Sequence, residues 1–499
     1  MRPVRAIPAG GPWPPRDQFR ALAERGDLIP VSREILADLE TPVSAFLKLH
    51  RGPYGFLLES VRGAERWGRF SFLGTEPAQV LRIRGDALEL ETPGGETERR
   101  TTRDPLGELQ RLLAAHRAVP VEGLPRFVGG AVGYLGYDVV RAFERLPELT
   151  EDDLELPDIE MLLVRDVVIF DNVAQTIRVV SHADLRGGVD PDAAYDAATA
   201  RLDELIARLD ARAVTPPAPA VDPGEPRANL TPEAYRGLVE RAKEYIRAGD
   251  VIQVVVAQRF EVPLAASPFN VYRCLRTTEP SPYMFYLALG PLALAGASPE
   301  VMVRVEDGEL TVRPIAGTRP RGGSERDDEA LAAELAADPK ELAEHVMLLD
   351  LGRNDVGRVA EVGTVKVTER FVIERYAHVM HLVSNVQGQL APGRDCFDAL
   401  RATFPAGTLS GAPKIRAMEI IEELEPVRRG VYGGAVGYFA HSGAMDTAIA
   451  IRSVVMRGGR AFIQAGAGIV ADSDPEAEHR ECLNKARAAL QAVRAAEQL

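Results

Sequence analysis

The chain has 499 residues, of which 46% are hydrophobic and 26% charged, proportions typical of a soluble globular protein. Its formal net charge of −14 and pI near 5.3 argue against a nucleic-acid-binding protein, which normally presents a basic face. The proline-rich N-terminus lacks the apolar core of a signal peptide, and no apolar run reaches membrane-spanning length. Three cysteines without a CxxC pair fit a reducing compartment, so we predict a cytoplasmic protein.

The first half is predicted to consist of an N-terminal arm over residues 1–25 and a domain over 26–211. Short apolar runs predict strands at 55–60, 69–74, 79–84, 87–91, 127–134, 161–171 and 176–181, and leucines at helical spacing predict a helix near 105–118. The last two strands are predicted to form a hairpin. A helix over about 191–211 closes this half.

The second half follows residues 212–230, whose prolines predict an extended, semi-rigid linker. A domain is predicted over 231–499, opening with a helix that ends at Gly249. Strands are predicted at 251–262, 283–289, 301–306, 309–314, 364–373, 443–455 and 460–468, with helices near 267–277, 327–351, 397–404, 411–423 and 475–497. Strands in blocks, without strict alternation with helices, predict an α+β fold: large antiparallel or mixed sheets in a sandwich-like core covered by helices.

The hexapeptide GGAVGY occurs twice, at 129–134 and at 433–438, each time within a strand-like run. Two independent glycine-rich strands, where backbones approach closely, would explain it. Equivalent positions in two related halves of the protein would explain it as well.

One predicted helix begins at Asp338 and Pro339, because aspartate caps free N–H groups and proline fits the first helical turn. Its apolar stripe is predicted to contain Leu342, Val346 and Leu349. Glu341 and Glu344 are three residues apart, so their carboxylates lie on one face.

A second predicted helix repeats this arrangement after Asp474 and Pro475. Glu478 and Glu481 are again three apart, and Lys485 lies one turn further. Two such pairs facing each other across a cleft could hold a hard cation such as Mg²⁺, because it prefers oxygen ligands. Each pair taken alone is more simply a solvated helix face.

Several other segments combine polar residues with glycine. GTRPRGG (317–323) is typical of an anion-binding or hinge loop. Neither PAGTLSGAPK (405–414) nor AGAGIVADS (465–473) matches a phosphate-binding or dinucleotide-binding motif, which argues against a nucleotide enzyme. Arg452 is a charge inside an apolar strand and needs an anionic partner if it is buried. His381, on a predicted strand, would more often be a structural residue.

Taken together, the chain resembles the chorismate-utilising enzyme family, in its anthranilate synthase branch. The matching segments are LLES (57–60), RFSFLG (69–74), SPYMFY (281–286), ASPE (297–300), IAGTRPRG (315–322), AEHVMLLDLGRND (343–355), FPAGTLSGAPK (404–414), RGVYGGAVGY (429–438), AIR (450–452) and AGAGIVADSDPEAEHRE (465–481). Their number and order extend the resemblance over nearly the whole chain.

The resemblance implies a substrate and a metal. Chorismate would bind with Mg²⁺ on its ring carboxylate, Glu344 and Glu481 being metal ligands and Glu478 part of the same metal site. Residues implied in substrate binding are Gly317, Thr318, Tyr432, Arg452, Gly466, Ala467, Gly468 and Lys485. Among them, Arg452, Tyr432 and the amides of 466–468 would hold the enolpyruvyl carboxylate.

The implied reaction is attack of ammonia on the ring at C2 with loss of the C4 hydroxyl, then elimination of pyruvate. Glu341 is the implied general acid, and His381 and Thr408 are assigned to the elimination, with His381 as proton carrier. Water-using relatives carry a lysine where this chain has Gln253, which points to ammonia. The Ala406-Gly407-Thr408 sequence favours going on to eliminate pyruvate.

The resemblance also implies regulation and a partner. A tryptophan feedback site would be formed by Leu58, Glu59, Ser60, Pro282, Tyr283, Met284 and Phe285. Glu279 stands where the family usually has Asn, and a glutamate cannot donate an amide hydrogen bond. No cysteine lies in a GxCxG-like elbow, so a separate glutamine amidotransferase subunit is expected to supply ammonia.

Two alternatives stay open beside an anthranilate synthase large subunit. An aminodeoxychorismate synthase would stop before the elimination, so its product would differ. A non-catalytic tryptophan-binding regulatory subunit would keep the fold, although it would have no need of the four glutamates, His381 and Arg452.

Overall fold

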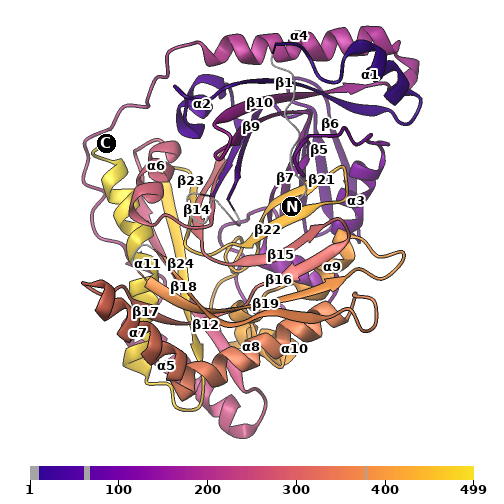
Figure 1. Ribbon diagram of the computed structural model, residues 1–499. Coiled ribbons are helices and arrows are strands. Elements are labelled where there is room, and N and C mark those ends of the chain that lie inside the picture. Colours follow the sequence, from indigo (N-terminus) through magenta and orange to yellow (C-terminus); the bar gives the residue numbers. More distant parts are fainter. Residues whose placement is uncertain (1–9, 61–67, 377–378) are drawn as a thin grey trace.

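The computed structural model describes residues 10–60, 68–376 and 379–499 (Figure 1). Its α-helices are α1 (Arg16–Ala23), α2 (Pro42–Leu49), α3 (Pro105–Ala114), α4 (Pro191–Leu209), α5 (Pro232–Ala248), α6 (Pro268–Thr278), α7 (Glu325–Ala337), α8 (Pro339–Gly357), α9 (Cys396–Thr403), α10 (Lys414–Leu424) and α11 (Pro475–Ala496). Short 3₁₀ turns are η1 (Tyr137–Ala142), η2 (Arg186–Gly188) and η3 (Gly407–Leu409). Within the described ranges, no helix is long and apolar enough to cross a membrane.

The first of two large sheets, sheet A, contains strands from both halves of the chain. In spatial order they are β1 (Leu28–Leu36), β10 (Thr176–Asp184), β9 (Asp166–Asp171), β3 (Phe70–Thr75), β2 (Tyr54–Glu59), β13 (Tyr283–Leu289), β14 (Leu292–Ser298), β23 (Ser453–Arg457), β24 (Arg460–Ile469), β12 (Gln253–Pro263) and β11 (Arg227–Ala228), with β20 (Gly411–Ala412) beside β12. The predicted hairpin is confirmed as the antiparallel pair β9–β10.

Sheet B is built in the same way. Its strands are β17 (Ile315–Pro320), β19 (Val379–Gln389), β16 (Glu309–Val312), β15 (Val301–Glu306), β22 (Met445–Ile449), β21 (Ala435–Ala440), β7 (Gly130–Leu135), β8 (Ile159–Val164), β4 (Gln79–Arg84), β5 (Ala87–Glu91) and β6 (Thr97–Thr101), with β18 (Lys366–Arg375) beside β19. Their pairings are antiparallel, as in sheet A.

The two sheets form a sandwich with helices on its outer faces. Between the sheets lies an aromatic and aliphatic core that includes Phe56 and Phe285 from sheet A and Tyr134 and Tyr438 from sheet B. Helices α1, α2, α4, α5, α6, α10 and α11 cover the outer face of sheet A, and α3, α8 and α9 cover that of sheet B. The predicted α+β sandwich is therefore confirmed.

The two halves of the chain join through hydrogen-bonded strands. In sheet B, β7 pairs with β21 and brings the two GGAVGY segments together, with Gly133 opposite Gly437. A Cβ on Gly133 would lie 2.0 Å from the Glu160 carbonyl oxygen, and one on Gly437 would lie 2.1 Å from that of Asp446. Each glycine thus allows the next strand to approach closely, which is what glycine-rich strands require.

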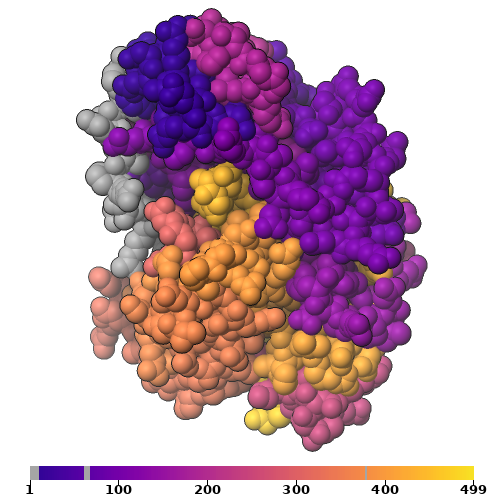
Figure 2. All heavy atoms as spheres, turned by 90° about the vertical axis from the view of Figure 1, so that its right-hand side faces the viewer, coloured from indigo at the N-terminus to yellow at the C-terminus, as the bar shows by residue number. Residues whose placement is uncertain are grey.

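Sheet A has the corresponding join between β2 and β13. The segments before and after the predicted linker consequently share both sheets, and Figure 2 shows N-terminal segments (indigo to purple) and C-terminal segments (orange) meeting on one face. In the predicted arm, α1 buries Phe19 against Tyr195 of α4, while residues 1–9 lie outside the described part. The domain boundaries themselves stay predictions.

Four local predictions need correction. The strand expected over 443–455 is divided between β22 of sheet B and β23 of sheet A. The helix expected over 327–351 is two helices, because Asp338 ends α7 and caps α8 before Pro339. The strand expected over 161–171 is divided between β8 and β9, which belong to different sheets. On α8, Val346 is 42% exposed, and the buried face instead contains His345, Leu348 and Leu349. His345 is accommodated because its Nε2 lies 2.7 Å from the Ser384 hydroxyl.

Candidate active site

The N-terminal turn of α8 is held by an arginine from sheet B. Asp338 accepts hydrogen bonds from the amides of Lys340 and Glu341, which confirms the predicted helix start. Arg319 on β17 binds the Asp338 carboxylate at 2.7 Å and the Glu341 carboxylate at 3.1 Å. Arg319 of the GTRPRGG segment therefore balances the negative charges of Asp338 and Glu341 at the start of α8.

Glu344 lies one turn further along α8, where its surroundings disfavour the charged form of its carboxyl group. Burial is the largest cause that raises its pKa, and the charges of Glu341 and Glu481 raise it further. The Gln253 amide, from β12, donates a hydrogen bond to it at 3.4 Å. The charges of α8 and α11 therefore act on each other across the space between these helices.

On α11, Asp474 caps the helix by accepting from the Ala477 amide at 2.8 Å, as predicted. Burial raises the pKa of Glu478, and the charge of Glu481 adds to this increase. Lys485 pairs with Glu481 at 2.7 Å and donates to the Gly466 carbonyl oxygen at 3.0 Å. Lys485 thus links the acidic helix to the glycine-rich strand β24.

The chemistry of these carboxylates fits a hard divalent cation, because oxygen donors suit Mg²⁺ and a cation would relieve the repulsion that, after burial, raises the pKa of Glu344. Within residues 10–60, 68–376 and 379–499, however, no three His, Cys, Asp or Glu side chains converge on one point as metal ligands would. The structure brings the two acidic faces near each other without forming a closed coordination site.

The sequence context of Arg452 predicted a position inside a strand. This prediction is wrong. Arg452 stands between β22 of sheet B and β23 of sheet A, where the chain crosses from one sheet to the other, and its φ is 51°. Such a backbone conformation is unusual for a residue with a side chain and often marks a functional position. Its carbonyl oxygen accepts from the Ala297 amide at 3.1 Å, and its guanidinium binds Glu279 at 2.7 Å.

The predicted glycine-rich segment lies on β24 opposite β12, with Gly466 paired to Ala257 and Gly468 to Val255. In the described residues, β23 pairs with β24 only up to Ile463. The rest of β24, up to Ile469, pairs with β12. A Cβ on Gly468 would lie 2.5 Å from the side-chain amide nitrogen of Gln253, so a larger residue there would displace that side chain. Tyr432, also predicted, is buried with Arg429 over its ring.

His381 on β19 lies beside the predicted Gly317–Thr318 segment. Its Nδ1 is 3.1 Å from the Gly317 carbonyl oxygen and 3.1 Å from the Thr318 hydroxyl. Because a carbonyl only accepts, this contact places the proton on Nδ1 and leaves Nε2 as the basic nitrogen. Burial lowers the pKa of His381, and the charge of Arg452 lowers it further, so a neutral imidazole is favoured at pH 7.

Glu300 is a candidate that the sequence analysis did not single out. It follows the wholly buried strand β14, is itself only 8% exposed, and accepts a hydrogen bond from the Thr408 hydroxyl at 3.2 Å. Burial raises its pKa to about 8. A carboxylate two residues after a mostly apolar strand, in ASPE, was the available signal.

A cavity of about 40 Å³ reaches Glu300 and Thr408 from the side of α8, and Leu348, Leu351 and Asp355 also line it. Such a space suits a few water molecules and is far below the roughly 300 Å³ at the lower end of small-molecule pockets. Of the site residues predicted from the sequence, Thr408 lines this cavity.

Comparison with known proteins gives the family. A family model described as chorismate binding enzyme matches residues 58–491. The chain belongs to the chorismate-binding enzyme family. It is 52% identical to "Anthranilate synthase component 1" of Pseudomonas aeruginosa, covering 97% of this chain and 99% of that one, and 49% identical to the Pseudomonas putida protein of that name, covering 97% and 99%. The crystal structure of anthranilate synthase component I from Streptococcus pneumoniae matches with TM-score 0.74 and 38% identity, covering 91% of this chain and 98% of that one.

In this chorismate-binding enzyme, the two segments predicted to bind tryptophan are neighbours. β2 and β13 pair with Met284 opposite Glu59 and Phe285 opposite Leu58. Leu58 and Phe285 face the core between the sheets, whereas Met284 packs under α6 and Glu59 binds Arg276 of that helix at 3.0 Å.

The remaining residues predicted to bind tryptophan also lie apart from one another. Tyr283 donates to Asp446 at 2.9 Å, while Ser60 and Pro282 are half-buried beyond the paired region. The backbone segments therefore meet as expected, but their side chains point to two different faces of sheet A.

Proposed function

We propose that this chain is the large subunit of an anthranilate synthase, which converts chorismate and ammonia to anthranilate and pyruvate. The relatives of that name, similar over nearly the whole chain, support the assignment. The observation that carries it is Gln253, whose neutral amide lies 3.4 Å from Glu344. By the resemblance, water-using relatives have their activating lysine at this position, so a neutral Gln253 favours ammonia, which needs no such base.

The proposed binding mode follows from charge. Arg452 takes the enolpyruvyl carboxylate, because a guanidinium binds carboxylates through two parallel hydrogen bonds. The amides of Gly466–Gly468 and the Tyr432 hydroxyl complete this end of the site. A magnesium ion held by Glu344, Glu478 and Glu481 would supply positive charge beside the ring carboxylate. Lys485 adds a second positive charge near these glutamates.

For protonation of the leaving hydroxyl, we favour Glu300 over the predicted Glu341. The carboxylate of Glu341 is already held in an ion pair by Arg319 at 3.1 Å. Glu300 has a pKa near 8, so it keeps its proton at neutral pH. As ammonia forms its bond to C2, the C1=C2 and C5=C6 double bonds shift to C1=C6 and C4=C5, and the C4 hydroxyl leaves as water with the Glu300 proton.

The second step is an elimination. His381 Nε2 takes the proton from C2 of the aminated intermediate, the electrons form the aromatic ring, and the C3–O bond breaks to release enolpyruvate, which becomes pyruvate. The low pKa of His381 supports this role, because it keeps the imidazole neutral and ready to accept a proton.

The partner and regulator are also proposals. Ammonia would come from a glutamine amidotransferase subunit, in keeping with the component 1 name of the relatives. Tryptophan would act as feedback inhibitor at the β2–β13 segments described above.

The first test is fluorescence of anthranilate from the purified chain with chorismate, Mg²⁺ and an ammonium salt at alkaline pH. We expect a signal that a chelator abolishes, and we expect Glu344→Gln to lower turnover at least about 100-fold, because the site loses a charged ligand. The matched control is Glu476→Gln, an exposed residue on α11. Consumption of chorismate without anthranilate would instead support an aminodeoxychorismate synthase, and untouched chorismate would support a regulatory subunit.

His381→Asn is expected to stop the reaction after the first step. The aminated intermediate should accumulate while anthranilate formation falls about 100-fold or more, because asparagine cannot accept the C2 proton. Chromatography of quenched reactions measures both species. Wild-type anthranilate output from this variant would rule out the proposed role.

A further inference from the structure

Arg452, the proposed ligand for the substrate carboxylate, already holds a carboxylate of its own chain. Its Nη1 lies 2.7 Å from Glu279 Oε1, and the two side chains are 29% and 23% exposed. The backbone of Arg452 is fixed at the crossover between the sheets by the hydrogen bond from Ala297. The guanidinium is thus already engaged by Glu279 before any substrate binds.

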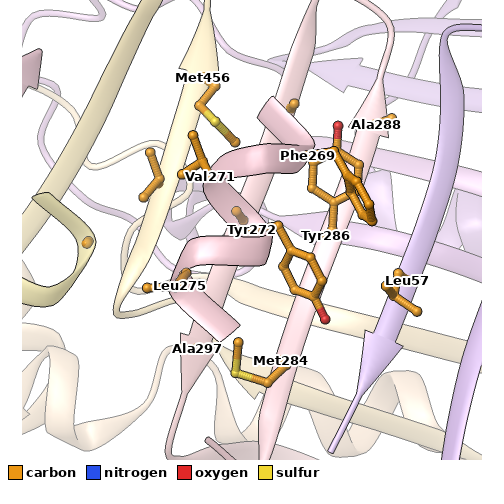
Figure 3. Close-up of a cluster of buried hydrophobic side chains, with 14 of the residues drawn as sticks. Leu57, Phe269, Val271, Tyr272, Leu275, Met284, Tyr286, Ala288, Ala297 and Met456 are labelled. Carbon is orange, nitrogen blue, oxygen red and sulfur yellow. The ribbon is translucent and has the colours of Figure 1, made fainter. Parts of the chain in front are cut away.

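Glu279 is also firmly placed. It forms the C-terminal cap of α6, its amide donating to the Leu275 carbonyl oxygen at 2.9 Å. α6 packs on β13 through Tyr272, whose ring centroid lies 5.9 Å from that of Tyr286 (Figure 3), and Arg276 anchors the helix to Glu59 of β2. The position of Glu279 beside Arg452 is thus set by a helix attached to sheet A.

We propose that Glu279 is an internal competitor of the substrate's carboxylate for Arg452 and thereby sets the affinity for chorismate. This inference rests on the proposed function, which gives Arg452 that ligand. Two carboxylates at one guanidinium repel each other, so substrate binding must break or share the existing ion pair. Part of the binding free energy of chorismate is spent on displacing Glu279, which weakens the observed affinity.

In the opposite role, Glu279 would aim Arg452 at the substrate. The two roles differ in the sign of one measurement. With Glu279→Gln, which keeps the size and removes the charge, competition predicts that KM for chorismate falls about three- to tenfold with kcat unchanged. An aiming role predicts that KM rises. An unchanged or raised KM overturns the proposal.

The matched control is Glu261→Gln, because Glu261 pairs with Arg460 at 2.8 Å on the same sheet but on its exposed surface. This variant should leave KM unchanged. Glu279→Asp, which retains the charge on a shorter side chain, should give a smaller decrease in KM and serves if the glutamine variant does not fold.

A double-mutant cycle separates the proposal from the function on which it rests. Chorismate binding is measured by calorimetry for Arg452→Gln alone and combined with Glu279→Gln. We expect Arg452→Gln to weaken binding and to abolish the effect of Glu279→Gln. If Arg452→Gln binds chorismate as the wild type does, the Arg452 assignment fails. If Arg452→Gln weakens binding but Glu279→Gln has no effect in the protein that retains Arg452, only the competition is refuted.

Discussion

Glu300→Gln is expected to lower kcat for anthranilate formation about 10²- to 10⁴-fold, the range by which a positioned general acid accelerates a reaction. Glutamine keeps the shape and can still accept the hydrogen bond from Thr408, but it has no acidic proton for the departing hydroxyl. KM for chorismate should change little. Stopped assays of anthranilate, with the thermal unfolding temperature as a folding check, measure the effect.

The pH dependence of the wild type tests the same residue. Glu300 must be protonated to act, so the rate at constant free ammonia should decline above its pKa of about 8. The stability follows the same direction: the unfolded carboxyl titrates near 4.5, so the stabilisation from a raised folded pKa is complete below that value and is lost as the pH rises through about 8.

Glu300→Gln should remove that part of the pH dependence from both rate and stability. Glu341→Gln is the comparison, because it deletes the other carboxylate considered for this step. A larger loss of kcat in Glu341→Gln than in Glu300→Gln would return the role to Glu341.

Arg429→Met is expected to destabilise the fold by about 3–5 kcal/mol, because it leaves a buried glutamate without its cation. Arg429 and Glu425 are each only 2% exposed in their side chains, and Arg429 also donates to the carbonyl oxygens of Leu409 and Val255. This network joins the Thr408 turn to β12, so the loss should also lower activity. Urea unfolding measures the change in the free energy of unfolding.

Two controls sharpen that result. Arg460→Met removes the cation of an ion pair whose arginine side chain is 61% exposed, and it should cost less than about 1 kcal/mol. Combining Arg429→Met with Glu425→Gln should restore much of the stability, because no charge then remains buried and glutamine still accepts from the Ala257 amide. A loss below about 1 kcal/mol in Arg429→Met would show that the buried pair contributes little.

Local sequence patterns determined the helices that carry the acidic pairs. Asp338-Pro339 and Asp474-Pro475 each start a helix, because capping and the fixed φ of proline act within a few residues. The strands and the α+β class followed in the same way from short-range alternation. The glutamate spacing likewise placed each pair on one helix face without reference to the rest of the chain.

Only the tertiary structure decided which partners the charged site residues have and how deeply they are buried. Arg452 looked like a strand residue because its flanks are apolar, yet those flanks belong to strands of two different sheets and the chain crosses between them there. The ion pair of Arg452 with Glu279 and the raised pKa of Glu300 depend on residues that are remote in sequence or on burial by the whole fold. Burial and long-range electrostatics are properties of the assembled sandwich, which local sequence patterns do not encode.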